Sequence, residues 1–175
     1  VGYILIGLAS ANAAGIKGVV IYMLIYVVMN IAIFSIILSL KNNNSYIEKI
    51  SELSGLSKSK PIISLSIAII MLSLAGIPPF AGFFGKFYIF IAAVEADLIF
   101  LAVLGVISSV ISAYYYLRII KVLYFDEVGD CNYQSIITSQ SLVLLICAIL
   151  FLSFFVFYPS VFVNIGTTIS LDFFQ

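Results

Sequence analysis

Apolar segments alternate with short polar segments along this chain, and their lengths predict helices that cross a membrane. One span needs about 20 apolar residues. Residues 19–40, 98–121 and 136–158 each fit a single straight span. Residues 1–13 are too few to cross, so we read them as the end of a span. From this we expect the chain to be a piece of a longer subunit, or one part of a split subunit whose N-terminal part is a separate chain.

The apolar run within residues 62–96 has an unusual length and an interruption near its middle. As one helix it would measure roughly 50 Å, too long for a straight span and short for two. Pro78 and Pro79 remove backbone donors and clash with the preceding turn, and Gly76 and Gly82 flank them. We therefore predict a helix break between Gly76 and Gly82, covered by protein or facing a wet cavity.

The positions of the basic residues decide whether residues 62–96 cross the membrane once or twice. If they cross once, the Lys-rich loop at residues 41–60 lies on the same side as Arg118 and Lys121, and that side holds six of the eight Lys and Arg residues. The opposite side then carries Glu95, Asp97 and the C-terminus. Cytoplasmic loops are enriched in Lys and Arg, which favours one broken span over two very short ones.

Composition supports a membrane protein and excludes several kinds of chemistry. The chain is 63% hydrophobic and 9% charged, with a mean hydropathy of +1.24, whereas soluble domains are about 25% charged. Lipid is therefore an expected partner, and zero net charge without a basic patch makes nucleic acid an unexpected one. Histidine is absent and the only cysteines are Cys131 and Cys147. We expect no metal site and no redox cofactor in this chain.

Lys86 is the candidate functional residue, because it lies just after the predicted break. The near end of its span is about ten residues away, roughly 15 Å, which a lysine side chain cannot reach. Burying the charge at mid-span costs about 2.5–3.5 kcal/mol on insertion scales. The arrangement indicates a wet cavity or an acidic partner, and this chain has no acidic residue in the middle of a span. A lone ionisable group beside a broken helix is typical of an ion or proton path.

The segment Ser73–Tyr88 (SLAGIPPFAGFFGKFY) closely resembles the signature of subunit 2 of respiratory complex I, NADH:ubiquinone oxidoreductase, called chain N in bacterial enzymes. The resemblance covers most of the chain and is closest to alphaproteobacterial and mitochondrial forms, while the last forty residues match only in being apolar. Four further segments carry the resemblance: Val1–Gly7, Ile25–Asn30, Leu53–Lys58 and Ala113–Glu127, the last through its Tyr-Tyr-Tyr-Leu-Arg and Tyr-Phe-Asp-Glu stretches.

The resemblance implies an antiporter-like fold of two inverted repeats, each with a discontinuous helix, of which this chain would be the C-terminal part. Lys86 matches the family's channel lysine, whereas the family's charged residues of the first repeat have no counterpart here. The implied function is proton translocation along buried Lys and Glu residues, coupled to quinone reduction in other subunits, as part of an H⁺-translocating NADH:ubiquinone reductase. The implied partners are other membrane-arm subunits, and the implied location is the mitochondrial inner membrane or, alternatively, a bacterial plasma membrane.

Two other functions remain open at this point. The chain could belong to a multi-subunit cation/proton antiporter, or it could be a structural scaffold of the membrane arm that does not pump. The Gly85–Tyr88 stretch favours complex I, and a lysine kept in a costly position argues against a scaffold. For the fold we predict an all-α polytopic transmembrane bundle over residues 1–175 with one proline-broken helix. This bundle would be one half of an antiporter-like fold.

Overall fold

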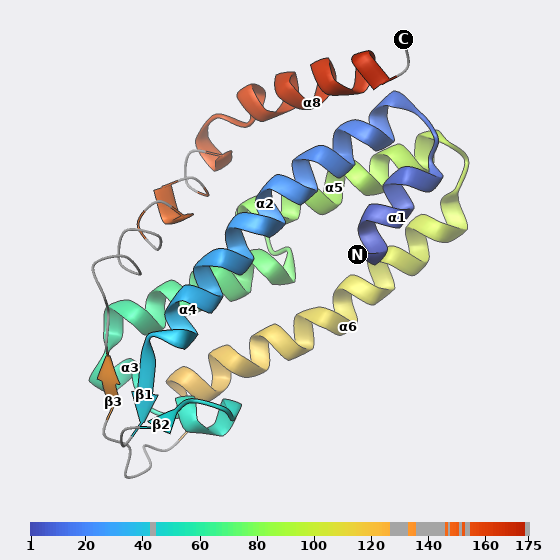
Figure 1. Cartoon of the computed structure of the whole chain (residues 1–175). Coiled ribbons are helices and arrows are strands. Elements are labelled where there is room, and N and C mark those ends of the chain that lie inside the picture. The colour runs from blue at the N-terminus through green and yellow to red at the C-terminus, as the bar shows by residue number, and fades with distance from the viewer. Residues whose placement is uncertain are drawn as a thin grey trace.

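The structure, a computed structural model, is an elongated bundle of helices whose long axes run roughly alongside one another (Figure 1). It describes residues 1–42, 45–126, 133–135, 146, 148–150, 152 and 155–173. The main helices are α1 (Gly2–Ala9), α2 (Ala13–Leu38), α4 (Pro61–Ala75), α5 (Ala81–Glu95), α6 (Ile99–Tyr124) and α8 (Pro159–Phe173). The predicted all-α bundle with one discontinuous helix is confirmed.

Two of the described helices, α2 and α6, are long and apolar enough to cross a membrane by themselves. Each has 26 residues, or about 39 Å of helix. Helix α2 begins earlier than the predicted span because Asn12 caps it, its side chain accepting a hydrogen bond from the Gly15 N–H at 2.7 Å. The predicted span at residues 136–158 lies largely outside the described residues. Helix α8, which follows it, was not among the predicted elements.

Two shorter helices, α4 and α5, of 15 residues each, lie where the sequence predicts a single broken span. Pro61 occupies the first turn of α4, where its missing N–H has no cost. The helix ends at Ala75 because Gly76 adopts the left-handed conformation (φ 82°), and α5 begins at Ala81. The helical backbone is thus interrupted over Gly76–Phe80, where the sequence predicts the break.

A small antiparallel sheet, which the sequence analysis did not anticipate, closes one end of the bundle. Its strand order is β2–β1–β3, from β1 (Leu40–Asn42), β2 (Ser45–Tyr46) and β3 (Tyr133–Ser135). The pairing of Leu40 with Ser135 joins the loop after α2 to the segment after α6. The short helices η1 (Ile50–Leu53) and α3 (Leu56–Ser59) contact α6 at the same end.

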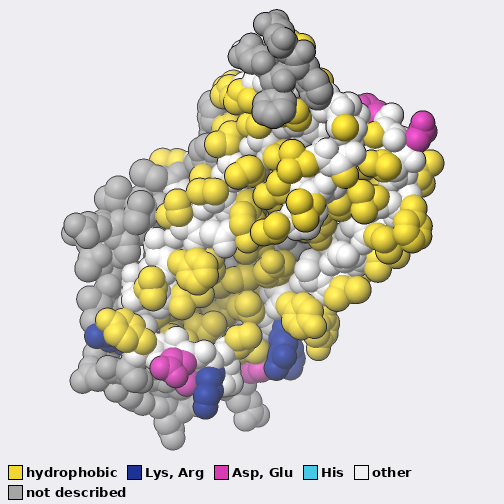
Figure 2. Space-filling view, turned by 45° about the vertical axis from the view of Figure 1, so that its right-hand side comes forward, with side chains coloured by type: hydrophobic (Ala, Val, Ile, Leu, Met, Phe, Trp, Pro, Cys, Tyr) yellow, Lys and Arg dark blue, Asp and Glu magenta, His cyan; other side chains and the backbone are white. Residues whose placement is uncertain are grey.

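The Lys-rich loop and the end of α6 therefore share one end of the bundle, as the charge distribution predicts. The α5–α6 turn, which carries Glu95 and Asp97, and the end of α8 lie at the opposite end (Figure 1). On the face shown in Figure 2, Lys and Arg side chains gather at one end together with some acidic ones, and a broad hydrophobic band separates them from further acidic side chains at the other end. This band is the expected surface of a segment surrounded by lipid.

Glycines let α2 and α5 approach closely, and this contact fixes where Lys86 lies. A Cβ on Gly18 of α2 would sit 3.1 Å from the backbone N of Ile89 on α5. A Cβ on Gly85 of α5 would sit 3.2 Å from the ring of Tyr22 on α2. Small residues at such contacts are the usual means of close helix packing in membranes. The residue next to Gly85 is Lys86, which is thereby held inside the bundle.

Labelling single cysteines from either side of the membrane tests this arrangement. In a chain with Cys131 and Cys147 replaced by Ser, we expect Ser59→Cys and Glu95→Cys, both exposed positions, to react with a membrane-impermeant maleimide from opposite sides. The side that labels Ser59→Cys should be the cytoplasmic one. Both should label after detergent permeabilisation, and labelling of both from the same side would contradict a single broken span.

Candidate functional site

The site begins at the C-terminal end of α4, where the helix leaves carbonyl groups without partners. The last four carbonyls of any helix lack intrahelical donors. The N–H of Gly76 donates to the carbonyls of Leu72 and Ser73, at 3.2 and 3.0 Å. This cap leaves the carbonyls of Leu74 and Ala75 to be satisfied by another donor.

Lys86 supplies that donor. Its Nζ donates to the Leu74 oxygen and the Ala75 oxygen, both at 3.0 Å, and to Ser109 Oγ at 2.9 Å. An ammonium group has three N–H donors, so these bonds use its full capacity. The cation also lies at the negative end of the α4 dipole, which favours it. Lys86 is only 6% exposed, so it does not reach the surface of the described chain.

The direct partners of Lys86 are neutral groups rather than a carboxylate. We expected an acidic partner or a wet cavity, and the groups bonded to Lys86 are two backbone carbonyls and one hydroxyl. The ion pair Lys121–Asp126, 3.2 Å apart, lies near the surface and away from Lys86. A carboxylate from another segment or subunit stays a prediction.

Both predicted break glycines lie against this site, whereas the prolines do not. A Cβ on Gly76 would lie 3.0 Å from Lys86 Cδ and 3.1 Å from its Nζ. The N–H of Gly82 donates to Ser73 Oγ at 3.0 Å, and a Cβ on Gly82 would collide with the Ser73 carbonyl. Pro78 and Pro79 form the connecting turn and are exposed.

A cavity of about 180 Å³ adjoins Lys86 between α1, α2, α4, α5 and α6. Four tyrosines contribute to its wall: Tyr3, Tyr22, Tyr26 and Tyr116. The Lys86 Nζ also lies 5.3 Å from the centre of the Tyr3 ring, a cation–π distance. The space is large enough for several water molecules, and its hydroxyl groups suit them.

Sequence reasoning missed the contribution of α6 to this site. Ser109, Ser112 and Tyr116 follow the i, i+3, i+7 spacing of one helix face, and the last two line the cavity. That spacing is the signal that could have found them. The structure separates the three consecutive tyrosines: Tyr114 and Tyr115 are 65% and 60% exposed, while Tyr116 faces inward.

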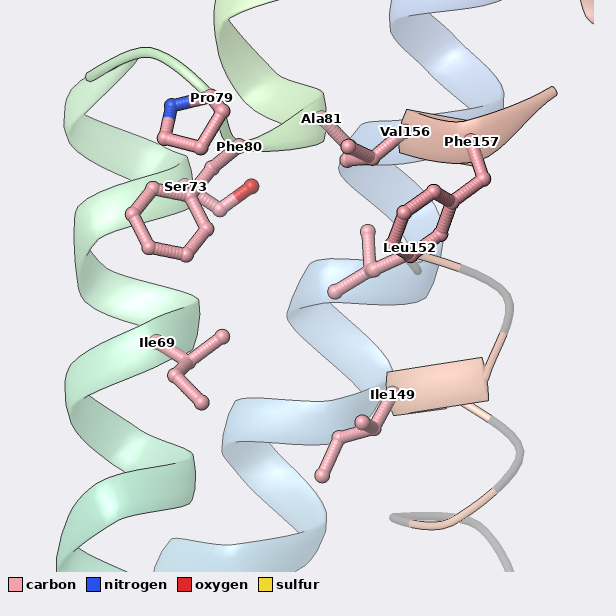
Figure 3. A pocket seen from close by; sticks show the side chains of 9 residues that line it. All are labelled: Ile69, Ser73, Pro79, Phe80, Ala81, Ile149, Leu152, Val156 and Phe157. Carbon is pink, nitrogen blue, oxygen red and sulfur yellow. The ribbon is translucent and has the colours of Figure 1, made fainter. Parts of the chain in front are cut away.

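A second cavity, of about 220 Å³, lies at the same break and is almost entirely apolar (Figure 3). In Figure 3, Ile69, Ser73 and Phe80 face Leu152 and Phe157 across it. Ser73 is its polar wall residue, and the Ser73 hydroxyl already accepts the Gly82 N–H. This cavity therefore offers apolar volume and no groups for acid–base chemistry.

With this geometry in view, the chain can be compared with known proteins. The model of the family described as NADH:quinone oxidoreductase/Mrp antiporter, TM, matches residues 1–112. The chain belongs to this family. A curated relative, NADH-quinone oxidoreductase subunit N of Parvibaculum lavamentivorans, is 49% identical over 159 residues, which are 91% of this chain and 33% of the relative. The chain thus spans about a third of the length of this relative.

Solved structures of the family share the fold. A structure of respiratory complex I from Thermus thermophilus with bound aureothin has a chain that matches with a TM-score of 0.76 and 25% identity, covering 93% of this chain and 36% of that one. The Mrp complex from Dietzia sp. DQ12-45-1b matches with a TM-score of 0.77 at 19% identity, covering 96% of this chain and 39% of that one. The second likeness shows the fold alone. The recognised family and a membrane location are confirmed.

The close contact at Gly82 predicts that a larger residue at this position lowers the stability of the fold. In Gly82→Ala the added methyl group must push α5 away from the Ser73 carbonyl, and overpacking of this kind costs about 1–3 kcal/mol. We expect a lower thermal midpoint for the membrane-extracted protein. Gly2→Ala is the matched control, because a Cβ there meets no atom within 4 Å. Equal midpoints for the two variants would show that the break tolerates displacement.

Proposed function

We propose that this chain forms the C-terminal part of a proton-translocating membrane-arm subunit of NADH:quinone oxidoreductase, and that Lys86 carries protons through it. The observation that carries the proposal is the buried ammonium of Lys86, bonded to the carbonyls of a broken helix beside a tyrosine-lined cavity. The curated relatives named subunit N support the choice of enzyme.

Opposing effects act on the charge of Lys86, which suits a proton carrier. Burial at mid-span disfavours the ammonium by about 2.5–3.5 kcal/mol on insertion scales. Hydrogen bonds to a charged group return about 1.5–3 kcal/mol each. Because each hydrogen bond is worth nearly as much as the burial cost, the loss of partners would shift Lys86 toward its neutral form.

The energy for this proton movement would come from outside the chain. We infer that NADH oxidation and quinone reduction take place in other subunits, that this chain holds no redox cofactor, and that a further segment or a separate chain supplies the other buried charges of the path. Coupling between distant sites is reciprocal, so proton release at Lys86 would in turn affect the redox steps. The partners would be other membrane-arm subunits and lipid. The bacterial relatives favour a bacterial plasma membrane over the mitochondrial inner membrane.

A subunit of a cation/proton antiporter is the second candidate, because the Mrp complex matches the fold as well as complex I does. The 49% identity to subunit N favours complex I. Purification from native membranes separates the two: flavin and iron–sulfur subunits should co-purify with this chain if it belongs to complex I.

Substitution of Lys86 in the assembled complex tests the proton role. We expect Lys86→Ala to lower proton pumping per NADH oxidised, because a positioned acid–base group contributes about 10²–10⁴-fold to the rate of proton transfer. Lys86→Arg should also impair pumping, because arginine keeps its proton at every accessible pH. Lys121→Ala, at a surface lysine 69% exposed, is the control and should pump normally.

Assembly of each variant is checked by the amount of complex recovered. Normal pumping by a fully assembled Lys86→Ala complex would remove the proton-path role and would favour the scaffold alternative.

A further inference from the structure

Helix α5 begins inside the bundle and needs acceptors for its first backbone N–H groups, because these groups have no partner within their own helix. Phe80 occupies the N-cap position, and its apolar side chain makes no capping hydrogen bond. The Phe83 N–H donates to the Phe80 carbonyl at 3.1 Å. The N–H of Gly82, the second residue of α5, needs an acceptor from another part of the chain.

Ser73 of α4 supplies this acceptor. Its Oγ accepts the Gly82 N–H at 3.0 Å, and Ser73 is only 1% exposed. An N-cap side chain normally bonds the N–H of the second or third helical residue. Ser73 therefore caps α5 from a different helix, nine residues earlier in the chain. Ser66 of the same helix behaves differently, because its Oγ donates to the Ile62 carbonyl within α4.

The hydrogen bonds across the break cap both half-helices at once. Ser73 is followed directly by Leu74 and Ala75, whose carbonyls accept hydrogen bonds from Lys86. Gly82 lies four residues before Lys86, about one turn away on the same face of α5. Helix α4 thus caps the start of α5 through Ser73, and α5 caps the end of α4 through Lys86. A displacement of α5 from Ser73 would also carry Lys86 away from its carbonyls.

The fit at the break makes the position of Lys86 depend on where α5 begins. A Cβ on Gly82 would collide with the Ser73 carbonyl, so the two half-helices are in direct contact there. A Cβ on Gly76 would lie 3.1 Å from Lys86 Nζ, so the lysine side chain lies against the turn. Ser73, Gly82 and Lys86 all line the tyrosine-lined cavity, which is the nearby space for water.

We propose that Ser73 is a positioning residue for Lys86: by capping α5 across the break, it holds the lysine against the Leu74 and Ala75 carbonyls. Without the Ser73 hydroxyl, the Gly82 N–H loses its acceptor, and arrangements in which water reaches that N–H become more favourable. These arrangements displace the start of α5 and release Lys86 toward the cavity. Ser73 itself neither takes nor gives the transported proton. The effect on pumping rests on the proposed role of Lys86 as a proton carrier.

The test measures how readily acetic anhydride acylates Lys86 in the assembled complex, with mass spectrometry as the readout. Lys86 is 6% exposed and bonded to three acceptors, so we expect slow modification in the unsubstituted chain. Ser73→Ala should raise it by about 5- to 150-fold, which corresponds to the cost of about 1–3 kcal/mol of an unsatisfied buried donor. Lys121, 69% exposed, is the internal reference and should react equally in every variant.

Two matched variants separate the hydroxyl from general packing. Ser73→Thr keeps the hydroxyl, and Ser73 also lines the apolar cavity of about 220 Å³, which has room for the added methyl group. Ser66→Ala is the control, because Ser66 is 5% exposed on the same helix and bonds only the Ile62 carbonyl. Both should leave the acylation of Lys86 near its original rate. Pumping per NADH oxidised should fall in Ser73→Ala and be retained in these two variants.

Unchanged acylation of Lys86 in Ser73→Ala would overturn the positioning role. Equal changes in Ser73→Ala and Ser66→Ala, or in Ser73→Ala and Ser73→Thr, would assign the effect to packing and overturn it as well. Should Ser73→Ala not assemble, Ser73→Cys makes the same comparison, because a thiol is a weak acceptor.

The labelling result and the pumping result separate this inference from the proposed function. If Ser73→Ala raises the acylation of Lys86 while Lys86→Ala pumps normally, the positioning role stands and the proton role of Lys86 is wrong. If Lys86→Ala loses pumping while Ser73→Ala changes neither acylation nor pumping, the proton role stands and the positioning role is wrong.

Discussion

Inside a bilayer every backbone polar group needs a partner, and this requirement links the broken helix to Lys86. The end of α4 leaves two carbonyls that no backbone donor satisfies, and Lys86 carries a charge that lipid would exclude. Either feature alone would be costly at this depth. Together they satisfy each other, because the lysine donates hydrogen bonds to the free carbonyls. The Gly76–Phe80 turn and Lys86 therefore form a single structural unit.

The rest of the bundle serves to hold that unit in place. Close contacts at Gly18 and Gly85 set α5 against α2, and the Gly82 N–H bonds back to Ser73 across the turn. These contacts hold α5 closely against α2 and against the end of α4. The polar space beside Lys86 is the tyrosine-lined cavity between α1, α2, α4, α5 and α6.

Much of this arrangement could be predicted from the sequence. The features that could not be predicted share a physical cause. Pro78 and Pro79 in an overlong apolar run indicate a break, and the basic residues indicate which loops share a side. The partner of Lys86 could not be predicted, because it depends on how α6 is rotated about its axis. Ser108 and Ser109 are chemically identical neighbours, and only the packing decides which one faces the lysine. The β1–β3 pairing was missed for a similar reason, since it joins segments far apart in the chain.

The ammonium of Lys86 bridges two helices, the end of α4 and the middle of α6. Its bond to Ser109 spans 2.9 Å, and a hydrogen bond is lost beyond about 3.5 Å. A slide of α6 against α4 by well under one ångström is therefore enough to leave the charge with two acceptors instead of three. The hydrogen bonds that stabilise the charged form of Lys86 therefore depend on the relative position of these two helices.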